Sequence, residues 1–235
     1  MEINKKDTEV KSESMADLAD NVAKESIEQM VERLGSDHVP SFGRSFEGGI
    51  QIQQIPDEIG PCLRKIVELM SSNTDGKLPS PLHYLEIGAA AGGTTYLVNE
   101  VLRPDKIVLI DDNCHPKHHV RPYILRDIPH DEIIGHSQAD GTVDVLKSSG
   151  LMFDIILIDG DHTYSGVKKD AEIYKNFLSP GGFMVFHDSA MIEWGVANVV
   201  MEMIKHDVDF DFVDEYRTSN KNLRPLGLAL FRKRV

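Results

Sequence analysis

Two short stretches of this sequence end in side chains that could carry acid–base or metal chemistry. The apolar run "FDIILI" is followed by Asp159 and His162, and the run "GFMVF" by His187 and Asp188. Carboxylates beside an open position suit a hard divalent ion such as Mg²⁺, and an imidazole nearby can take a proton from a substrate hydroxyl. We therefore expect Asp159 and His162 to be catalytic, and Asp159, His187 and Asp188 to be candidate ligands of a divalent cation.

A second set of residues has the spacing of a nucleoside-binding site. "LEIGAAAGG" is an apolar run that includes Glu86 and then turns through small residues, which let backbone approach a ligand closely. "KIVLIDD" follows, and an acid at its end can accept hydrogen bonds from both ribose hydroxyls. The dinucleotide pattern G-x-G-x-x-G needs glycine where Ala90 stands, so a ligand with ribose and no pyrophosphate fits better. We expect Asp111 or Asp112 to hold ribose, with Asp111 preferred because it continues the strand; the alternative is that these acids cap a turn or a helix.

The elements that must position these residues alternate regularly along the chain. Strand-like apolar runs lie at 83–88, 106–111, 131–136, 153–159 and 182–188. Helix-length segments lie at 56–70, 92–103, 115–126, 140–149, 164–178 and 191–205. Near-continuous apolar strands joined by helices predict a parallel sheet buried on both faces, which binds ligands at the carboxyl ends of its strands. The last two runs, 208–216 and 226–234, have no helix between them, so we expect an antiparallel hairpin that completes an α/β, seven-stranded, mostly parallel sheet.

These motifs resemble those of one enzyme family. "YLEIGAAAGGTT" followed by "KIVLIDD" looks like motifs I and II of class I S-adenosylmethionine-dependent methyltransferases. "FDIILIDGDHTYSGVKKDAEIYKNFLSPGGFMVFHD" is similar to the small-molecule O-methyltransferase group that includes macrolide-sugar methyltransferases and cephalosporin-hydroxylase-like proteins, and "IQQIPDEI" resembles that group's segment ahead of motif I. The resemblance covers roughly residues 45–233 and implies a Rossmann-like sheet.

The resemblance also implies where the cofactor, S-adenosylmethionine, would bind. Glu86 would reach its methionine end, Asp111 would hold its ribose, and Ser137 and Gln138 in "GHSQAD" would lie near its adenine. The full set of implied cofactor-binding residues is Glu86, Gly88, Ala90, Gly92, Asp111, Asp112, Ser137, Gln138 and Asp159.

The metal site departs from the pattern of metal-dependent relatives, in which an Asp-x-x-His on the fourth strand and an acidic pair on the fifth do this work. Asp159-Gly-Asp-His162 preserves the first element. His187 stands where the macrolide-sugar enzymes have a carboxylate, and Ser189 where the catechol-type enzymes have an asparagine. An Asp/Asp/His set still binds a divalent ion, and imidazole shifts its preference toward Mn²⁺, Fe²⁺ or Zn²⁺. Metal dependence therefore stays open. His162 is expected to be the general base; the alternative is a histidine that shapes its loop through backbone hydrogen bonds.

Composition narrows the class of substrate. The formal net charge of −13 argues against a broad phosphate-binding surface. The chain also lacks the Asn/Asp-Pro-Pro-Tyr/Phe run of enzymes that methylate base amino groups. We expect methylation of a hydroxyl on a small-molecule acceptor, with no nucleic-acid partner. The alternatives are a non-catalytic S-adenosylmethionine-binding or accessory protein and a nucleic-acid methyltransferase.

Other segments are less informative. "CHPKHH" could suggest zinc, but compact Cys/His sites usually need a second cluster, so a solvated loop is preferred. Trp194 is interpreted either as a wall of the acceptor pocket or as part of the core. No apolar stretch approaches the ~20 residues of a membrane span, and the first residues lack a signal-peptide core, so a cytoplasmic, membrane-free protein is expected.

The N-terminal part is expected to be an appendage of the methyltransferase domain, which we place at 46–235. Residues 1–45 would comprise a disordered tail, an amphipathic helix over 15–34 and a loop. The apolar stripe of that helix would pack against the core or a partner subunit, which makes a homo-oligomer an open expectation; the alternative is a lid over the active site.

Overall fold

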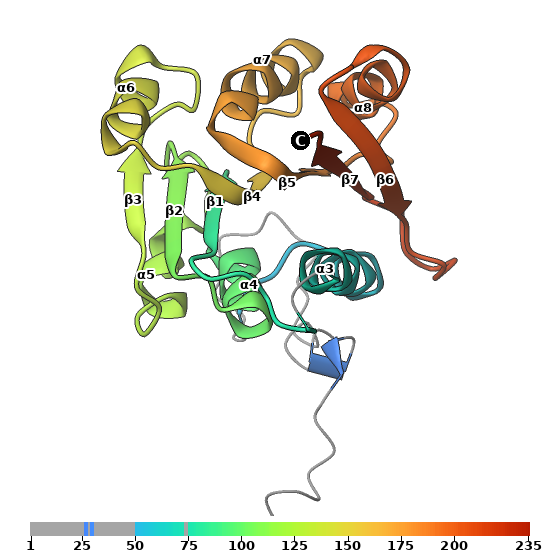
Figure 1. Cartoon of the computed structure of the whole chain (residues 1–235), viewed down its shortest axis with the longest axis horizontal. Coiled ribbons are helices and arrows are strands. Elements are labelled where there is room, and N and C mark those ends of the chain that lie inside the picture. Colours follow the sequence, from blue (N-terminus) through green and yellow to red (C-terminus); the bar gives the residue numbers. More distant parts are fainter. Residues whose placement is uncertain (1–25, 28, 31–49, 73–74) are drawn as a thin grey trace, which may run out of the picture.

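A computed structural model describes residues 26–27, 29–30, 50–72 and 75–235 (Figure 1). Within these residues the chain forms one seven-stranded sheet in the order β3-β2-β1-β4-β5-β7-β6. The strands are β1 (His83–Ile87), β2 (Lys106–Asp111), β3 (Asp131–Ile134), β4 (Phe153–Ile158), β5 (Leu178–His187), β6 (Phe210–Tyr216) and β7 (Leu228–Lys233). Strands β1 to β5 pair in parallel, and β7 is antiparallel to both β5 and β6. The predicted Rossmann-like, mostly parallel sheet with a terminal antiparallel hairpin is confirmed.

Helices cover both faces of the sheet. One face carries α3 (Pro56–Ser71), α4 (Gly93–Leu102) and α5 (Arg121–Ile124), and the other carries α6 (Asp140–Ser149), α7 (Tyr164–Tyr174) and α8 (Gly195–His206), as Figure 1 shows. The segment 115–126 differs from the expected helix. It forms a 3₁₀ turn at His118–Val120 and then the single turn of α5, because Pro116 and Pro122 do not suit a helix interior.

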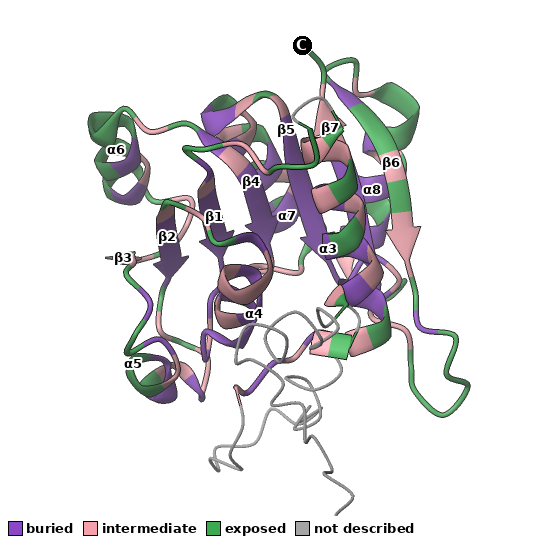
Figure 2. Cartoon of the chain, turned by 60° about the horizontal axis from the view of Figure 1, so that its bottom comes forward, coloured by how far each residue is buried: buried purple, intermediate pink, exposed green. Residues whose placement is uncertain are grey.

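The alternation of side chains along each strand explains the near-continuous apolar runs. In β4, Ile155 and Leu157 join the hydrophobic cluster beside α3 and α4, whereas Ile156 and Ile158 join the cluster beside α7 and α8. Successive strand residues point to opposite faces, so a sheet covered on both sides needs apolar residues at every position. The central strands are accordingly buried along most of their length (Figure 2).

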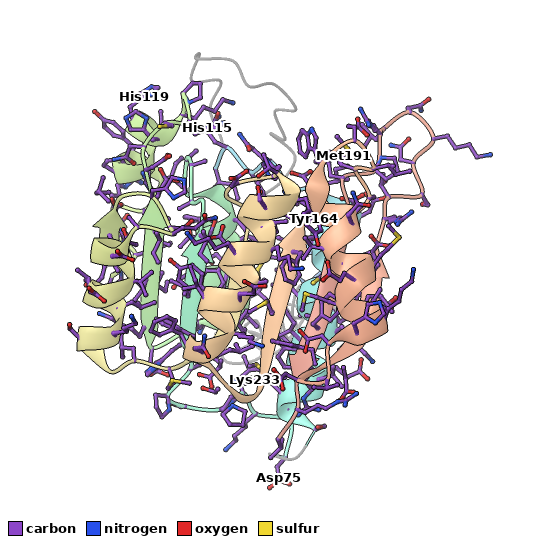
Figure 3. All side chains as sticks on the ribbon, turned by 90° about the horizontal axis from the view of Figure 1, so that it is seen from above. Asp75, His115, His119, Tyr164, Met191 and Lys233 are labelled. Carbon is purple, nitrogen blue, oxygen red and sulfur yellow. The ribbon has the colours of Figure 1, made fainter. Side chains whose placement is uncertain are left out.

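The strand order creates a switch point beside β1. The chain runs from β1 outward through β2 to β3, then returns to place β4 on the other side of β1. The connections after β1 and β4 therefore diverge to opposite faces and leave a crevice at their carboxyl ends, which is where open parallel sheets bind ligands. In Figure 3, His115, Tyr164 and Met191, which follow β2, β4 and β5, lie at this one end of the molecule, and Lys233 lies at the other.

The N-terminal predictions fall mostly outside the described residues. The tail at 1–12 and the loop at 38–49 are outside them, and the predicted helix over 15–34 is described only at residues 26–27 and 29–30, where Ile27, Gln29 and Met30 are helical. Across the described part of the chain, every helix is too short or too polar to cross a membrane.

Candidate active site

A cavity of about 530 Å³ lies at the carboxyl ends of β1, β2 and β4. Its lining draws on the turn after β1, the loop after β2, the segment after β3 and the segment after β4. The predicted residues found in this lining are Gly88, Ala90, Asp111, Asp112, Ser137, Asp159 and His162. The structure therefore brings most of the predicted site into one space.

The turn after β1 needs small residues because it packs against the end of β4. Gly88 has a φ of 86°, and a Cβ there would lie 2.1 Å from the backbone oxygen of Asp159. Ala90 also has positive φ (44°), and Gly92, with φ 85°, caps the start of α4. Gly92 is not in the cavity lining; a Cβ there would meet Leu125 at 2.9 Å. The turn thus forms a backbone wall of the cavity, and Gly92 lies outside the lining, close to Leu125.

Asp111 joins this turn to the end of β2. Its Oδ2 accepts a hydrogen bond from the Ala90 amide at 2.8 Å, and its Oδ1 accepts one from the Asn113 amide at 2.7 Å. The buried Arg121 guanidinium lies 3.4 Å from the same Oδ1. Oδ1 thus accepts from two donors, whereas Oδ2 accepts from one and keeps a second lone pair, so Asp111, which lines the cavity, retains acceptor capacity at Oδ2. Asp112 is exposed, lines the same cavity and accepts from the Cys114 amide at 2.9 Å.

The segment after β3 is held in place by α7. Ser137 donates to Asp170 Oδ1 at 2.8 Å and lines the cavity. The Gln138 side chain is outside the cavity lining and instead donates to the Gly166 carbonyl at 2.9 Å. Of the two residues expected near adenine, the structure thus places Ser137 at the cavity and uses Gln138 to tie the segment to the helix.

Contrary to the expectation from the sequence, Glu86 does not line the cavity. It is 1% exposed, and its Oε2 accepts hydrogen bonds from the Tyr84 hydroxyl at 2.8 Å and from Thr95 at 2.6 Å. Because strand residues two apart share a face, Glu86 points with Tyr84 toward the layer of α3 and α4. Burial raises the pKa of Glu86 to about 8, although the two hydroxyl donors act against that shift. At neutral pH its carboxyl is therefore mostly protonated.

Two carboxylates and two imidazoles meet beyond the ends of β4 and β5. His162 Nε2 lies 3.3 Å from Asp159 Oδ1 and 3.0 Å from Asp188 Oδ2. His187 Nδ1 lies 3.0 Å from Asp159 Oδ1 and 3.3 Å from Asp188 Oδ2. The backbone of Asp188 has positive φ (60°), a conformation that is strained for most residues other than glycine and that often marks a functional site. One oxygen of each carboxylate thus contacts both imidazoles.

The charges in this cluster stabilise one another. Burial alone would lower the pKa of His162, but hydrogen bonds and charge from Asp159 and Asp188 raise it to about 9. The pKa of His187 is likewise raised well above its ordinary value, against the effect of its burial. Burial would raise the pKa of both carboxyls, yet the imidazoles hold the pKa values of Asp159 and Asp188 below their ordinary range. At neutral pH both carboxylates are ionised and His162 is protonated.

The donor chemistry of this cluster fits a divalent cation. Ligand atoms of Asp159, His162 and Asp188 all lie within 4.8 Å of one another, and Asp188 Oδ1 is buried without a hydrogen-bond partner among the described residues. The predicted ligand set had His187 in place of His162. His187 is 4% exposed and contacts the two carboxylates from the buried side, where its N–H can orient them, whereas His162 lines the cavity.

Several side-chain contacts at the site were not predicted from the sequence. Gln53 and His115 line the cavity, and the Gln53 amide lies 3.1 Å from His115 Nε2. His115 belongs to "CHPKHH", the segment interpreted above as a solvated loop. Gln54, which contacts Asp159, lies in the segment "IQQIPDEI", for which the sequence predicted no role of this residue. Trp194, interpreted above as a pocket wall or a core residue, stacks on His162 with ring centroids 4.6 Å apart, and both line a second cavity of about 630 Å³. No local pattern marks these contacts, since each joins distant segments.

Comparisons with known proteins agree with this fold. Residues 85–189 match the family model described as "Methyltransferase domain". Among curated proteins, uncharacterized protein R132 of Acanthamoeba polyphaga mimivirus is 27% identical over 119 residues. The match covers 48% of this chain and 54% of R132, so the chain spans about half the length of that relative.

Solved structures of methyltransferases share the fold. An O-methyltransferase from Bacillus cereus in complex with S-adenosylhomocysteine has a TM-score of 0.57 and 14% identity, covering 92% of this chain and 95% of its own. The MycE methyltransferase of the mycinamycin pathway, in complex with Mg, S-adenosylhomocysteine and mycinamycin VI, has a TM-score of 0.55 and 19% identity, covering 87% of this chain and 54% of its own. The fold of this chain is that of S-adenosylmethionine-dependent methyltransferases.

Proposed function

We propose that this protein, which has the fold of S-adenosylmethionine-dependent methyltransferases, transfers a methyl group from S-adenosylmethionine to a hydroxyl oxygen of a small molecule. The observation that carries the proposal is the cavity at the switch point, because it runs from Asp111 and Ser137 to the cluster of Asp159 and His162. A nucleoside held at one end would direct its sulfonium toward an acid–base pair at the other.

The cofactor roles follow from the walls of this cavity. The lone pair that Asp111 retains on Oδ2 is suited to a ribose hydroxyl, and the turn at Gly88 and Ala90 offers backbone without side-chain obstruction. Ser137, which lines the same cavity, would contact the adenine of the cofactor. Methyl transfer is an in-line displacement, so most of the rate would come from aligning oxygen, methyl and sulfur.

His162 is the proposed general base, and its protonation sets a condition on that role. An imidazole with a pKa of about 9 holds its proton at neutral pH, so only the unprotonated fraction can accept one from the acceptor hydroxyl. Asp159 and Asp188 would hold the ring in place through Nε2. Asp159 and Asp188, together with His162 once its imidazole has lost its proton, are also the residues that would hold a divalent cation, which would lower the pKa of an acceptor hydroxyl when bound.

The second cavity supports a place for the acceptor. It shares His162 with the first cavity, and Trp194, Tyr164 and Asn198 contribute to its lining. An aromatic wall with a few polar groups is typical of small-molecule sites. A hydroxyl bound there would lie beside His162, the residue that both cavities share.

The test is calorimetric titration with S-adenosylhomocysteine. Wild type should bind it, and Asp111→Asn should weaken binding by about 10- to 100-fold, since a hydrogen bond to a charged group contributes roughly 1.5–3 kcal/mol. Asp112→Asn is the matched control, and we expect a change below about threefold. An absence of binding by wild type would refute the proposal. Adding EDTA to a methyl-transfer assay separates the two versions of the mechanism, because an unchanged rate would exclude the cation.

A further inference from the structure

The segment just before α3 crosses the active site and contacts its walls through three glutamines. We call residues 50–55 the glutamine strap. Gln51 Oε1 accepts from Lys117 Nζ at 2.9 Å, and the Gln53 amide contacts His115, so two glutamines reach the loop after β2. The backbone of the strap also lies against the start of α4, where a Cβ on Gly93 would be 2.4 Å from the Ile50 carbonyl oxygen.

The third glutamine reaches the reacting end of the site. Gln54 is 2% exposed, and its Nε2 donates to Asp159 Oδ2 at 2.9 Å. Its Oε1 accepts a hydrogen bond from Thr94, the second residue of α4. A carboxylate only accepts hydrogen bonds, so the amide nitrogen must face Asp159 and the amide oxygen must face Thr94. Asp159 therefore selects the amide orientation, and the Thr94 hydroxyl holds the amide in place by donating to its oxygen.

This arrangement divides the two oxygens of Asp159 between different partners. Oδ2 is taken by Gln54, and Oδ1 is left for His162 and His187. Without the amide, the carboxylate could rotate about its Cβ–Cγ bond, and either oxygen could meet the imidazoles. Terminal sp³–sp² torsions of this kind have broad minima, so the partners must define the angle.

We propose that Gln54, anchored by Thr94, is a positioning residue that sets the orientation of the Asp159 carboxylate toward His162 and His187. Its catalytic meaning rests on the proposed methyltransferase function, but the geometric effect does not. These hydrogen bonds also connect the first turn of α4, through Thr94, to Asp159. Gln54 and Asp159 are 105 residues apart in the sequence.

The experiment compares three substitutions in the full chain. Gln54→Met removes both hydrogen bonds at similar size, and Gln54→Glu keeps the Thr94 bond but turns a second carboxylate toward Asp159. Thr94→Val removes the anchor alone. Side-chain ¹⁵N–¹H spectra of the histidines report the His162 and His187 imidazoles directly, and calorimetry with S-adenosylhomocysteine reports the cofactor site.

Both Gln54 variants should shift the imidazole signals of His187 and His162, with the larger shift for Gln54→Glu. Thr94→Val should shift the same signals less, and Thr94→Val combined with Gln54→Met should match Gln54→Met alone, because the two residues act through one bond chain. Gln53→Met is the matched control from the same strap. It contacts His115 and should leave the His187 signal in place.

Unchanged His162 and His187 signals in folded Gln54 variants would overturn the proposal, as would fully additive effects of the Gln54 and Thr94 substitutions. A Gln54 residue that only supports the fold would lower the melting temperature without a selective shift of these two imidazoles. Failure of wild type to bind S-adenosylhomocysteine would refute the proposed function and leave the positioning result standing, so the two outcomes are distinguishable.

Discussion

Glu86 and Asp159 lie on neighbouring strands of one sheet, yet their carboxyls are held in opposite protonation states. Glu86 lies in β1 and Asp159 directly follows β4, which pairs with β1. Burial raises the pKa of Glu86 to about 8. Burial acts on Asp159 in the same direction, but His187 and His162 hold the pKa of Asp159 far below its ordinary range.

The difference lies in the chemistry of the partners. Hydroxyls from Tyr84 and Thr95 donate neutral hydrogen bonds to Glu86, which do not compensate the removal of a charge from water. Imidazolium groups beside Asp159 supply both a hydrogen bond and a positive charge. Glu86 is thereby a neutral part of the framework beside the turn after β1, while Asp159 is a charged group at the cavity.

Removing the charge should separate the two positions most clearly. Asp159→Asn leaves the buried His187 and the half-buried His162 with one carboxylate fewer, and loss of one partner of a buried ion pair costs about 3–5 kcal/mol. Glu86→Gln replaces a mostly protonated carboxyl with a neutral amide of the same shape that has no proton to lose on unfolding, so at pH 7 we expect no loss and a gain on the order of 1–3 kcal/mol. Urea unfolding at pH 7 measures both. Equal losses would show that the two carboxyls share one protonation state.

The pH dependence of stability should carry a signature of Glu86. Its folded-state pKa of about 8 lies above the unfolded value near 4.5, so the folded state retains the proton more strongly. This contribution is complete below about pH 4.5 and is lost as the pH rises through 8. Relative to Glu86→Gln, wild type should lose on the order of 2–4 kcal/mol between pH 5 and 9. Unfolding curves at both pH values that run parallel for the two proteins would contradict this.

His162 should show opposite trends in stability and activity. Its pKa is raised from 6.5 to about 9, so its contribution to stability is complete below about pH 6.5 and disappears as the pH rises through 9. A general base needs the unprotonated ring, so the initial rate of methyl transfer should increase over the same interval. His162→Gln should remove this stability slope and reduce the rate by about 10²–10⁴-fold. A rate loss below tenfold would assign His162 a structural role.

The smallest expected effect tests the hydroxyl partners of Glu86. Tyr84→Phe removes one of two hydrogen bonds to its carboxyl and should cost about 0.5–1.5 kcal/mol. Because that bond favours the ionised form, its loss should also move the Glu86 titration to higher pH. Tyr174→Phe removes a tyrosine bond to the Ser137 carbonyl instead, so it should lower stability and leave this titration in place. A common shift in both variants would contradict the assignment.

Much of the fold could be predicted because it rests on local patterns. The apolar runs, the helices between them and the final pair of strands without a helix were sufficient to define the sheet and its terminal hairpin. The rule that parallel sheets bind ligands at their carboxyl ends then placed Asp111, Asp159, His162 and Asp188 at one edge, where the structure finds them.

The remainder depended on contacts that no local pattern records. The position of Glu86 followed from the face to which its strand position points, and the sequence alone did not show that this face is covered by α3 and α4. The segment at 115–126 forms short helical turns in place of the expected helix, and it contributes His115 to the cavity wall.

The amino-acid sequence by itself determined the strands, the edge at which the site lies and the residue types gathered there, because strand periodicity and the alternation of strands with helices are encoded within short stretches. Only the tertiary structure decided that Asp159 is charged, that Glu86 is neutral and that Gln54 supports Asp159. These properties arise from dielectric environment and hydrogen-bond donors, which come from segments such as 50–55 and 187–188 that meet only when the chain is folded.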